Sequence, residues 1–175
     1  MTNWPDLREI MHSIDWVIVG GVATRAYMPE RMTKDLHILI QAADETAVLS
    51  RLQTAGYEIV QPLAIAGYVL QSAEGVEIDL LLGSQPWLEE ALAHPELDPA
   101  GYPVLGFPYL ILMKMNASRG RDFGDITTML GWAEPETLDK VRTVVATYSP
   151  QDSKDLESLI FIGQQEQIQS ADYAD

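Results

Sequence analysis

Two short apolar runs joined through a glycine pair constrain the fold of this chain more than any other feature. The first run covers residues 16–19 and ends in Gly20 and Gly21, and the second covers residues 36–40. Because glycine has no Cβ, the backbone N–H groups of such a turn can approach a phosphate closely, and the start of a following helix favours negative charge. This order predicts a strand, a phosphate-binding turn, a short helix and a second strand.

Acidic side chains accompany these strands. Asp35 and His37 are two residues apart, so both should point to the same face of a strand. A later apolar run at residues 75–82 contains Asp79, where an unpaired buried charge would be costly. A purely structural explanation, in which Asp35 ends a strand and Asp79 pairs with a lysine, leaves the glycine pair unexplained. A phosphate-binding turn beside an acidic face is typical of a metal–nucleotide site.

These residues resemble the nucleotidyltransferase superfamily with the polymerase-beta-like fold, especially its small bacterial members from abortive-infection and toxin–antitoxin systems. The family pattern is a strand, a Gly-Gly or Gly-Ser turn, an Arg-x-Thr-x-Asp-x-Asp segment and a third Asp on a later strand. Residues 109–130 resemble the family's lysine-containing helix, basic turn and Asp-x-x-Asp helix, so the resemblance covers about the first three-quarters of the chain. The matching residues of the first pattern are Gly20, Gly21, Arg31, Thr33, Asp35 and Asp79.

The resemblance implies transfer of a nucleoside monophosphate from a nucleoside triphosphate to a hydroxyl acceptor, with magnesium or manganese as the divalent metal. In such reactions two metal ions can clamp the attacking and leaving oxygens. It also implies that Asp35 and Asp79 are the catalytic carboxylates. The expected nucleotide-binding residues are Gly20, Gly21, Arg31, Thr33, Lys34 and Lys114, and the expected metal ligands are Asp35, His37 and Asp79.

His37 departs from the family pattern, because it stands where the second metal-binding aspartate is expected. A neutral imidazole can bind zinc or manganese, but it is a poor magnesium ligand and brings no negative charge. Three alternatives follow: weak or absent catalysis, use of another metal, or substitution by another carboxylate such as Glu77. The alternative function is a catalytically weak binding module of a toxin–antitoxin or phage-defence pair, with a small helical protein as its partner.

Lys114 also has two interpretations. In the first it reaches the triphosphate, as its counterpart is thought to do in the family. In the second, Asp122 and Asp125, which are three residues apart and share a helix face, anchor Lys114 or a neighbouring arginine. We expect a structural role for both aspartates.

The formal net charge of −15 argues against binding of a long nucleic-acid duplex, which depends on many Lys and Arg contacts. Six of the eleven basic residues nevertheless fall in two short windows, which suits a nucleoside triphosphate or one RNA end. No apolar run reaches the roughly 18 residues of a membrane span. The absence of cysteine fits an intracellular protein, so we expect a cytoplasmic one. The clustered basic residues are Arg25, Arg31, Lys34, Lys114, Arg119 and Arg121.

The pattern of apolar residues changes from strand-like to helical near Gly106. We therefore expect an α/β (α+β) fold in which residues 1–106 form a nucleotidyltransferase-like mixed sheet flanked by helices. Residues 107–168 should form a C-terminal helical bundle packed on this core, and residues 169–175 a disordered tail. A helix is also expected at residues 4–13, with a proline in its first turn.

Overall fold

The computed structural model describes residues 5–29, 33, 35–117 and 120–172 of the chain, and only the backbone of residues 121 and 170–172. The chain forms two compact units. Unit 1 comprises Met1–Ala23 and Arg31–Leu105, and unit 2 comprises Thr24–Glu30 and Gly106–Asp175. Unit 2 is therefore made of two separate pieces of the chain, and the first of these lies inside the segment expected to form the α/β core.

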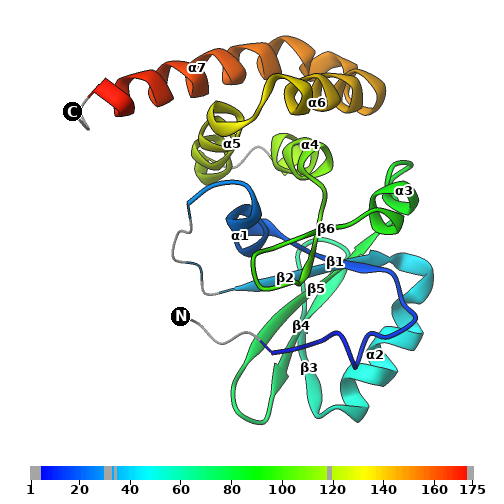
Figure 1. The fold of residues 1–175 in the computed structure, drawn as a ribbon. Coiled ribbons are helices and arrows are strands. Elements are labelled where there is room, and N and C mark those ends of the chain that lie inside the picture. The colour runs from blue at the N-terminus through cyan, green and yellow to red at the C-terminus, as the bar shows by residue number, and fades with distance from the viewer. Residues whose placement is uncertain (1–4, 30–32, 34, 118–119, 173–175) are drawn as a thin grey trace. The chain divides into compact units, whose positions relative to one another are not determined.

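Unit 1 is built on a mixed seven-stranded sheet with the strand order β3-β4-β5-β2-β1-β7-β6 (Figure 1). The pairs β2–β5 and β1–β7 are parallel, and the other neighbours are antiparallel. This sheet and its flanking helices confirm the expected α/β fold class. The strands are β1 (Trp16–Val19), β2 (Leu36–Gln41), β3 (Tyr57–Pro62), β4 (Gly67–Ser72), β5 (Glu77–Gly83), β6 (Glu96–Leu97) and β7 (Pro103–Val104).

Short helices connect and cover these strands: α1 (Gly20–Ala23), α2 (Glu45–Thr54), preceded by the 3-10 turn η2 (Ala42–Asp44), and α3 (Leu88–Ala93). Val48 and Leu52 of α2 are fully buried. Leu88 of α3 packs against Gly83 so closely that a Cβ at that glycine would overlap its side chain. Gly83 lies four residues after Asp79 on β5, and side chains of even separation share a strand face. Helix α3 therefore covers the far end of the face that carries Asp79.

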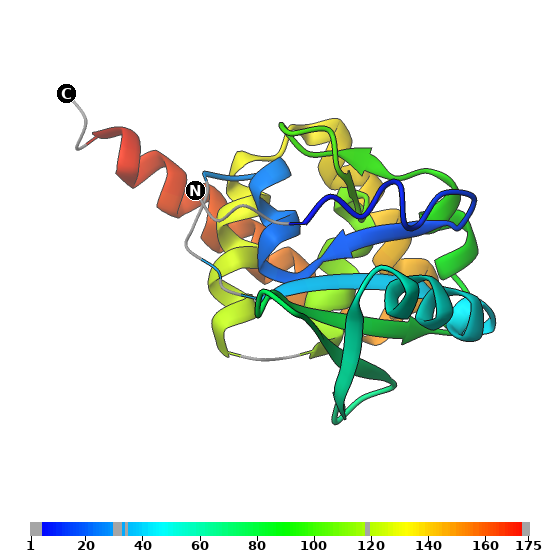
Figure 2. The same ribbon diagram turned by 90° about the horizontal axis from the view of Figure 1, so that it is seen from below.

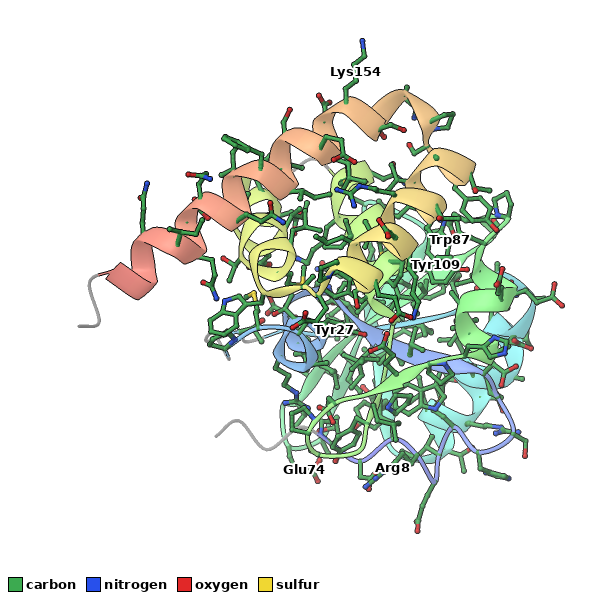
Figure 3. All side chains as sticks on the ribbon, turned by 45° about the horizontal axis from the view of Figure 1, so that its top comes forward. Arg8, Tyr27, Glu74, Trp87, Tyr109 and Lys154 are labelled. Carbon is green, nitrogen blue, oxygen red and sulfur yellow. The ribbon has the colours of Figure 1, made fainter. Side chains whose placement is uncertain are left out.

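The helix expected at residues 4–13 is absent from the described part of this segment. Residues 8–13 form turns, and Ser13 takes a left-handed conformation with φ of 62°. Leu7 and Met11 are both buried, and the Met11 N–H donates to the Leu7 carbonyl. A short helix is costly to nucleate. The burial of Leu7 and Met11 therefore determines the course of the backbone in this segment. Arg8 lies at the surface (Figure 3), and its guanidinium stacks 4.6 Å from the centre of the Tyr102 ring.

Unit 2 is helical and confirms the expected C-terminal bundle. Helix α5 packs along α7, and α4 packs against α6. The C-terminal half of α7 extends past α5 (Figure 2). Tyr27 and Phe107 meet edge to face with ring centres 5.0 Å apart, which joins the segment at residues 24–30 to α4. The elements are η1 (Thr24–Ala26), α4 (Phe107–Ala117), α5 (Gly120–Trp132), α6 (Pro135–Tyr148), η3 (Pro150–Asp152) and α7 (Ser153–Asp172).

Helix α7 continues into the segment that was expected to be a disordered tail. Residues 169–172 are helical, and residues 173–175 lie outside the described part of the chain. No helix within the described ranges combines the length and the apolar character that crossing a membrane requires.

Candidate functional site

The candidate site lies on one face of the central strands of unit 1. In the parallel pair β2–β5, His37 stands directly beside Asp79, and in the antiparallel pair β1–β2 it stands beside Val19. The His37 Nε2 and Asp79 Oδ2 atoms are 3.1 Å apart. The side chains are 23% and 21% exposed, so a solute can reach both. Strand pairing thus brings together two predicted site residues that are far apart in the sequence.

Gly20 follows β1 directly and completes this arrangement. Its φ of +69° is a left-handed conformation that side chains with a Cβ rarely adopt. A Cβ at this position would also lie only 2.9 Å from His37 Nδ1. The imidazole therefore lies between Gly20 and Asp79, and glycine is needed here for conformation and for space. Gly21 is the second residue of α1 and is partly exposed.

Asp35 precedes β2 and has an exposed side chain. The negative charge of the Asp35 carboxylate acts on the pKa of the Asp79 carboxyl. Burial raises the pKa of the Asp79 carboxyl above its ordinary value, the nearby His37 lowers that pKa, and Asp35 raises it again. The His37 imidazole and the Asp35 carboxylate therefore both act on Asp79 at this end of the sheet.

The other residues predicted for the phosphate lie in the same stretch of chain. Thr33 is partly buried, whereas Arg31 and Lys34 lie outside the described residues. Their expected phosphate contacts stay predictions.

A complete metal-ligand cluster is not formed by the residues that the structure describes. Within those ranges, no group of three or more His, Asp or Glu side chains is arranged to hold a metal ion. Glu77, considered as a substitute carboxylate, is exposed at the start of β5. The metal-binding roles of Asp35, His37 and Asp79 stay predictions. Of these three residues, His37 and Asp79 are in direct contact.

Lys114 belongs to unit 2 and is almost fully buried there. Its Nζ donates to Asp122 Oδ1 at 2.9 Å and to Asp125 Oδ2 at 2.7 Å. All three side chains are about 5% exposed. The expectation that these aspartates anchor Lys114 is confirmed. The nucleotide-binding role of Lys114 is a separate prediction.

Two features of the site were not anticipated from the sequence. The residues His37 and Asp79 were expected as separate metal ligands, but they contact each other. Gly20 was expected only to expose backbone to phosphate, but it also makes room for the imidazole. Neither feature leaves a local signal, because both depend on which strands become neighbours.

Similar folds occur among solved structures at low sequence identity. The solution structure of the antibiotic-resistance factor ANT(2'')-Ia has a TM-score of 0.47 at 10% identity, over 93% of this chain and 89% of that chain. A crystal structure of ANT(2'')-Ia in complex with adenylyl-2''-tobramycin has a TM-score of 0.47 at 14% identity, over 87% and 88%. The lincosamide antibiotic adenylyltransferase LnuA with bound lincomycin has a TM-score of 0.43 at 14% identity, over 79% and 90%.

No protein-family model matches this chain, and no curated protein matches it in sequence. Structural similarities of this size do not assign an activity to the chain.

Proposed function

We propose that this protein binds a nucleoside triphosphate on the face formed by Gly20, His37 and Asp79 and transfers the nucleoside monophosphate to a hydroxyl acceptor. The observation that carries the proposal is the contact between His37 and Asp79 beside the Gly20 turn. A polar pair between otherwise apolar strands is no better for stability than packed apolar side chains would be. Its presence on an accessible face is therefore better explained by chemistry than by folding.

Each residue has a role that its position permits. The backbone N–H groups at Gly20 and Gly21 would bind phosphate oxygens, with Thr33 as a hydroxyl donor. Asp35 has an exposed carboxylate and would accept the proton of the acceptor hydroxyl. The acceptor oxygen then bonds to the α-phosphorus while the bond from that phosphorus to the pyrophosphate oxygen breaks. The products are the nucleotidylated acceptor and pyrophosphate.

A divalent cation fits part of this site. His37 supplies an imidazole nitrogen and Asp79 a carboxylate oxygen, and cations in such sites are commonly completed by substrate phosphates. When bound, the cation would offset the negative charge of the triphosphate. The described residues do not supply the three-carboxylate set expected for two magnesium ions.

Calorimetric titration with each nucleoside triphosphate, in the presence of Mg²⁺ or Mn²⁺, tests binding directly. Transfer is followed as release of pyrophosphate with hydroxyl acceptors. We expect binding by the wild type, and loss of transfer without loss of binding in Asp35→Asn. Glu89→Gln, an exposed acidic residue on α3, is the matched control and should change neither. Absence of nucleotide binding up to about 1 mM would contradict the proposal, since that corresponds to only about 4 kcal/mol.

A second candidate function is nucleotide binding without transfer, as in a module of a toxin–antitoxin or phage-defence pair. The observation that favours it is the lack of a third metal ligand among the described residues. In this case the wild type binds nucleotide but releases no pyrophosphate, and His37→Asp restores release by completing a carboxylate set. A helical partner protein belongs to this candidate, and co-purification with the product of a neighbouring gene would test it.

The predicted role of Lys114 in nucleotide binding has its own test. We expect Lys114→Ala to weaken binding by about 1–3 kcal/mol if the lysine contacts a phosphate. Lys140→Ala is the control, because Lys140 is exposed on α6. Circular dichroism must show both variants folded, since Lys114 is buried with two aspartates. Unchanged affinity would leave Lys114 as a structural residue of unit 2.

A further inference from the structure

We infer that the outward face of α7 is the contact surface of a homodimer, in which the α7 helices of two copies pair antiparallel across a two-fold axis near Gln165. This surface belongs to unit 2, and it shares no residue with the site of the proposed function.

Helix α7 has one face that packs inside unit 2 and an opposite face that does not. Gly163 marks the inner face, because a Cβ there would overlap the carbonyl oxygen of Thr127 on α5. Each residue turns a helix by about 100°, so the positions opposite Gly163 recur every three or four residues. All of these side chains are exposed, and Lys154 points away from the helix (Figure 3). These positions, which we call the outward stripe, are Lys154, Ser158, Phe161, Gln165 and Ile168.

Two large apolar side chains lie on the outward stripe. Phe161 is 63% exposed and Ile168 is 57% exposed. They are seven residues apart, about two helical turns, so they lie on the same side of α7. A repeat of this length is the spacing by which one helix packs along another. The outward stripe is therefore suited to a helix as its partner.

The outward stripe lacks the acidic residues that are abundant in the rest of the chain. The chain has 26 Asp and Glu against 11 Lys and Arg, and its formal net charge is −15. The stripe contains no acidic residue, and its single charge is the positive charge of Lys154. Between residues 158 and 170 the one charged residue is Glu166, three positions after Gly163 and so nearer the inner face. Depletion of charge together with an exposed aromatic side chain is typical of the centre of a protein interface.

This charge pattern favours a second copy of the chain over other partners. A net charge of −15 repels nucleic acids and anionic lipid surfaces. A basic protein would find no carboxylate on the outward stripe with which to pair. An apolar stripe without negative charge is complementary to another of the same kind, and a two-fold axis allows one surface to contact itself.

The order of residues along the stripe favours the antiparallel arrangement. A two-fold axis midway between Phe161 and Ile168 places Phe161 of each copy against Ile168 of the other. Gln165 then lies beside its own counterpart at the centre of the contact. A parallel pair would instead bring the two Lys154 ammonium groups together, and like charges at an interface are unfavourable.

The C-terminal half of α7 gains most from such a contact. It extends past α5 (Figure 2), and the side chains of residues 164–169 are exposed except for Gln167, which is partly buried. A short helical segment with so little packing is only marginally stable in water. A second α7 would bury Ile168 and stabilise this half of the helix.

Sedimentation equilibrium of the full chain tests the inference directly. We expect the mass to rise from 19.4 kDa toward twice that value as the concentration increases from about 1 μM to about 1 mM. A contact between two single helices lies at the small end of interface sizes, so the dimer is a weak one. Added salt should strengthen association, because it screens the repulsion between two copies of net charge −15. A monomer at every concentration, or association that weakens with salt, would overturn the inference and leave a different protein as the occupant of the stripe.

Substitutions on the stripe identify the surface. Phe161→Gln and Ile168→Gln should each weaken dimerisation by at least about tenfold, since a two-fold contact contains each apolar side chain twice. Ile65→Gln is the matched control, because Ile65 is 64% exposed and belongs to unit 1. Circular dichroism verifies that all three variants are folded. Equal weakening by all three, or by none, would overturn the inference.

Introduced thiols test the antiparallel arrangement, because the chain has no cysteine of its own. Gln165→Cys should form a disulfide-linked dimer under mild oxidation. Ser158→Cys should remain monomeric under denaturing conditions, because the antiparallel pair separates the two Ser158 positions by about 20 Å along the helices. A disulfide requires Cα atoms within about 7 Å of each other. Equal cross-linking at both positions, or none at Gln165→Cys, would overturn the inference.

Discussion

At the scale of single residues, charged side chains are tolerated inside apolar surroundings only where a partner compensates them. Lys114 is buried with Asp122 and Asp125 at hydrogen-bond distance, which offsets the cost of removing its charge from water. The contact of His37 with Asp79 is more accessible, with side chains 23% and 21% exposed. Lys114 and its two aspartates are therefore a structural feature. The contact of His37 with Asp79 is a candidate functional site.

Gly20 provides the sharpest test at this scale. Gly20→Ala should lower the free energy of unfolding by more than Gly56→Ala, measured by urea denaturation. Both glycines have positive φ, which costs a residue with a Cβ about 1–2 kcal/mol, but only at Gly20 would the Cβ also crowd another side chain. The imidazole signals of His37 should shift in Gly20→Ala and stay unchanged in Gly56→Ala. Equal costs for the two variants would contradict the close contact with His37.

The pKa of Asp79 should respond in opposite directions to its two neighbours. Asp35→Asn removes a charge that raises this pKa and should lower it, whereas His37→Gln removes a lowering influence and should raise it. Carboxyl ¹³C titration of Asp79 measures both changes. Shifts in the same direction in both variants would be inconsistent with this arrangement.

The raised pKa also sets the sign of the effect of pH on stability. A folded-state pKa above the ordinary value of 3.8 gives stability that is present below that value and lost as pH rises through the folded pKa. Wild-type protein should therefore lose stability relative to Asp79→Asn over this range of rising pH. Urea denaturation of both proteins at a series of pH values checks the sign.

At the scale of elements, the contact between α5 and α7 depends on two glycines. A Cβ at Gly131 would overlap the backbone of Gly163, and a Cβ at Gly163 would overlap the carbonyl oxygen of Thr127. Because the atoms in the way are backbone atoms, rotation of a side chain cannot relieve the overlap. The two helices can approach this closely only with glycine at both positions.

Gly163→Ala should therefore destabilise the protein by about 1–3 kcal/mol, the usual cost of overpacking. Gly124→Ala on α5 is the matched control, since a Cβ there meets no atom within 4 Å. That control should stabilise the protein by about 0.5–1 kcal/mol, because alanine favours a helix interior. Thermal and urea unfolding measure both effects. A neutral Gly163→Ala would show that the helices separate freely.

At the scale of the whole molecule, the two units are not consecutive pieces of the chain. Residues 24–30 leave unit 1 after α1 and belong to unit 2, where Tyr27 packs on Phe107. The units are thus connected through three crossings of the backbone. Folding of unit 1 alone would leave this inserted segment without its helical partners.

A fragment of residues 1–105 should accordingly unfold with low cooperativity and associate in solution. Its urea transition and its elution in size-exclusion chromatography are compared with those of the full chain. A fragment of residues 1–169, which lacks only the end of α7 and the residues after it, should stay within roughly 0.5 kcal/mol of the full chain, as surface changes usually do. Sharp, monomeric unfolding of residues 1–105 would show that unit 1 folds independently.

The sequence by itself determined the features that repeat locally. The strands predicted at residues 16–19 and 36–40, the glycine pair between them and the helical pattern after Gly106 follow from spacing and from the conformational freedom of glycine. The polar character of Asp35 and Asp79 within apolar surroundings also marked the candidate site. Such patterns extend over a few residues, so they can be recognised in the sequence without knowing which residues are close in space.

Only the tertiary structure decided the rest. The register of β2 beside β5 placed His37 against Asp79, and the path after β1 placed Gly20 against the same ring. Burial of Leu7 and Met11 replaced an expected helix with turns. The physical reason is the same in each case: a contact between distant residues depends on which surfaces are buried together, and local propensity holds no information about that choice.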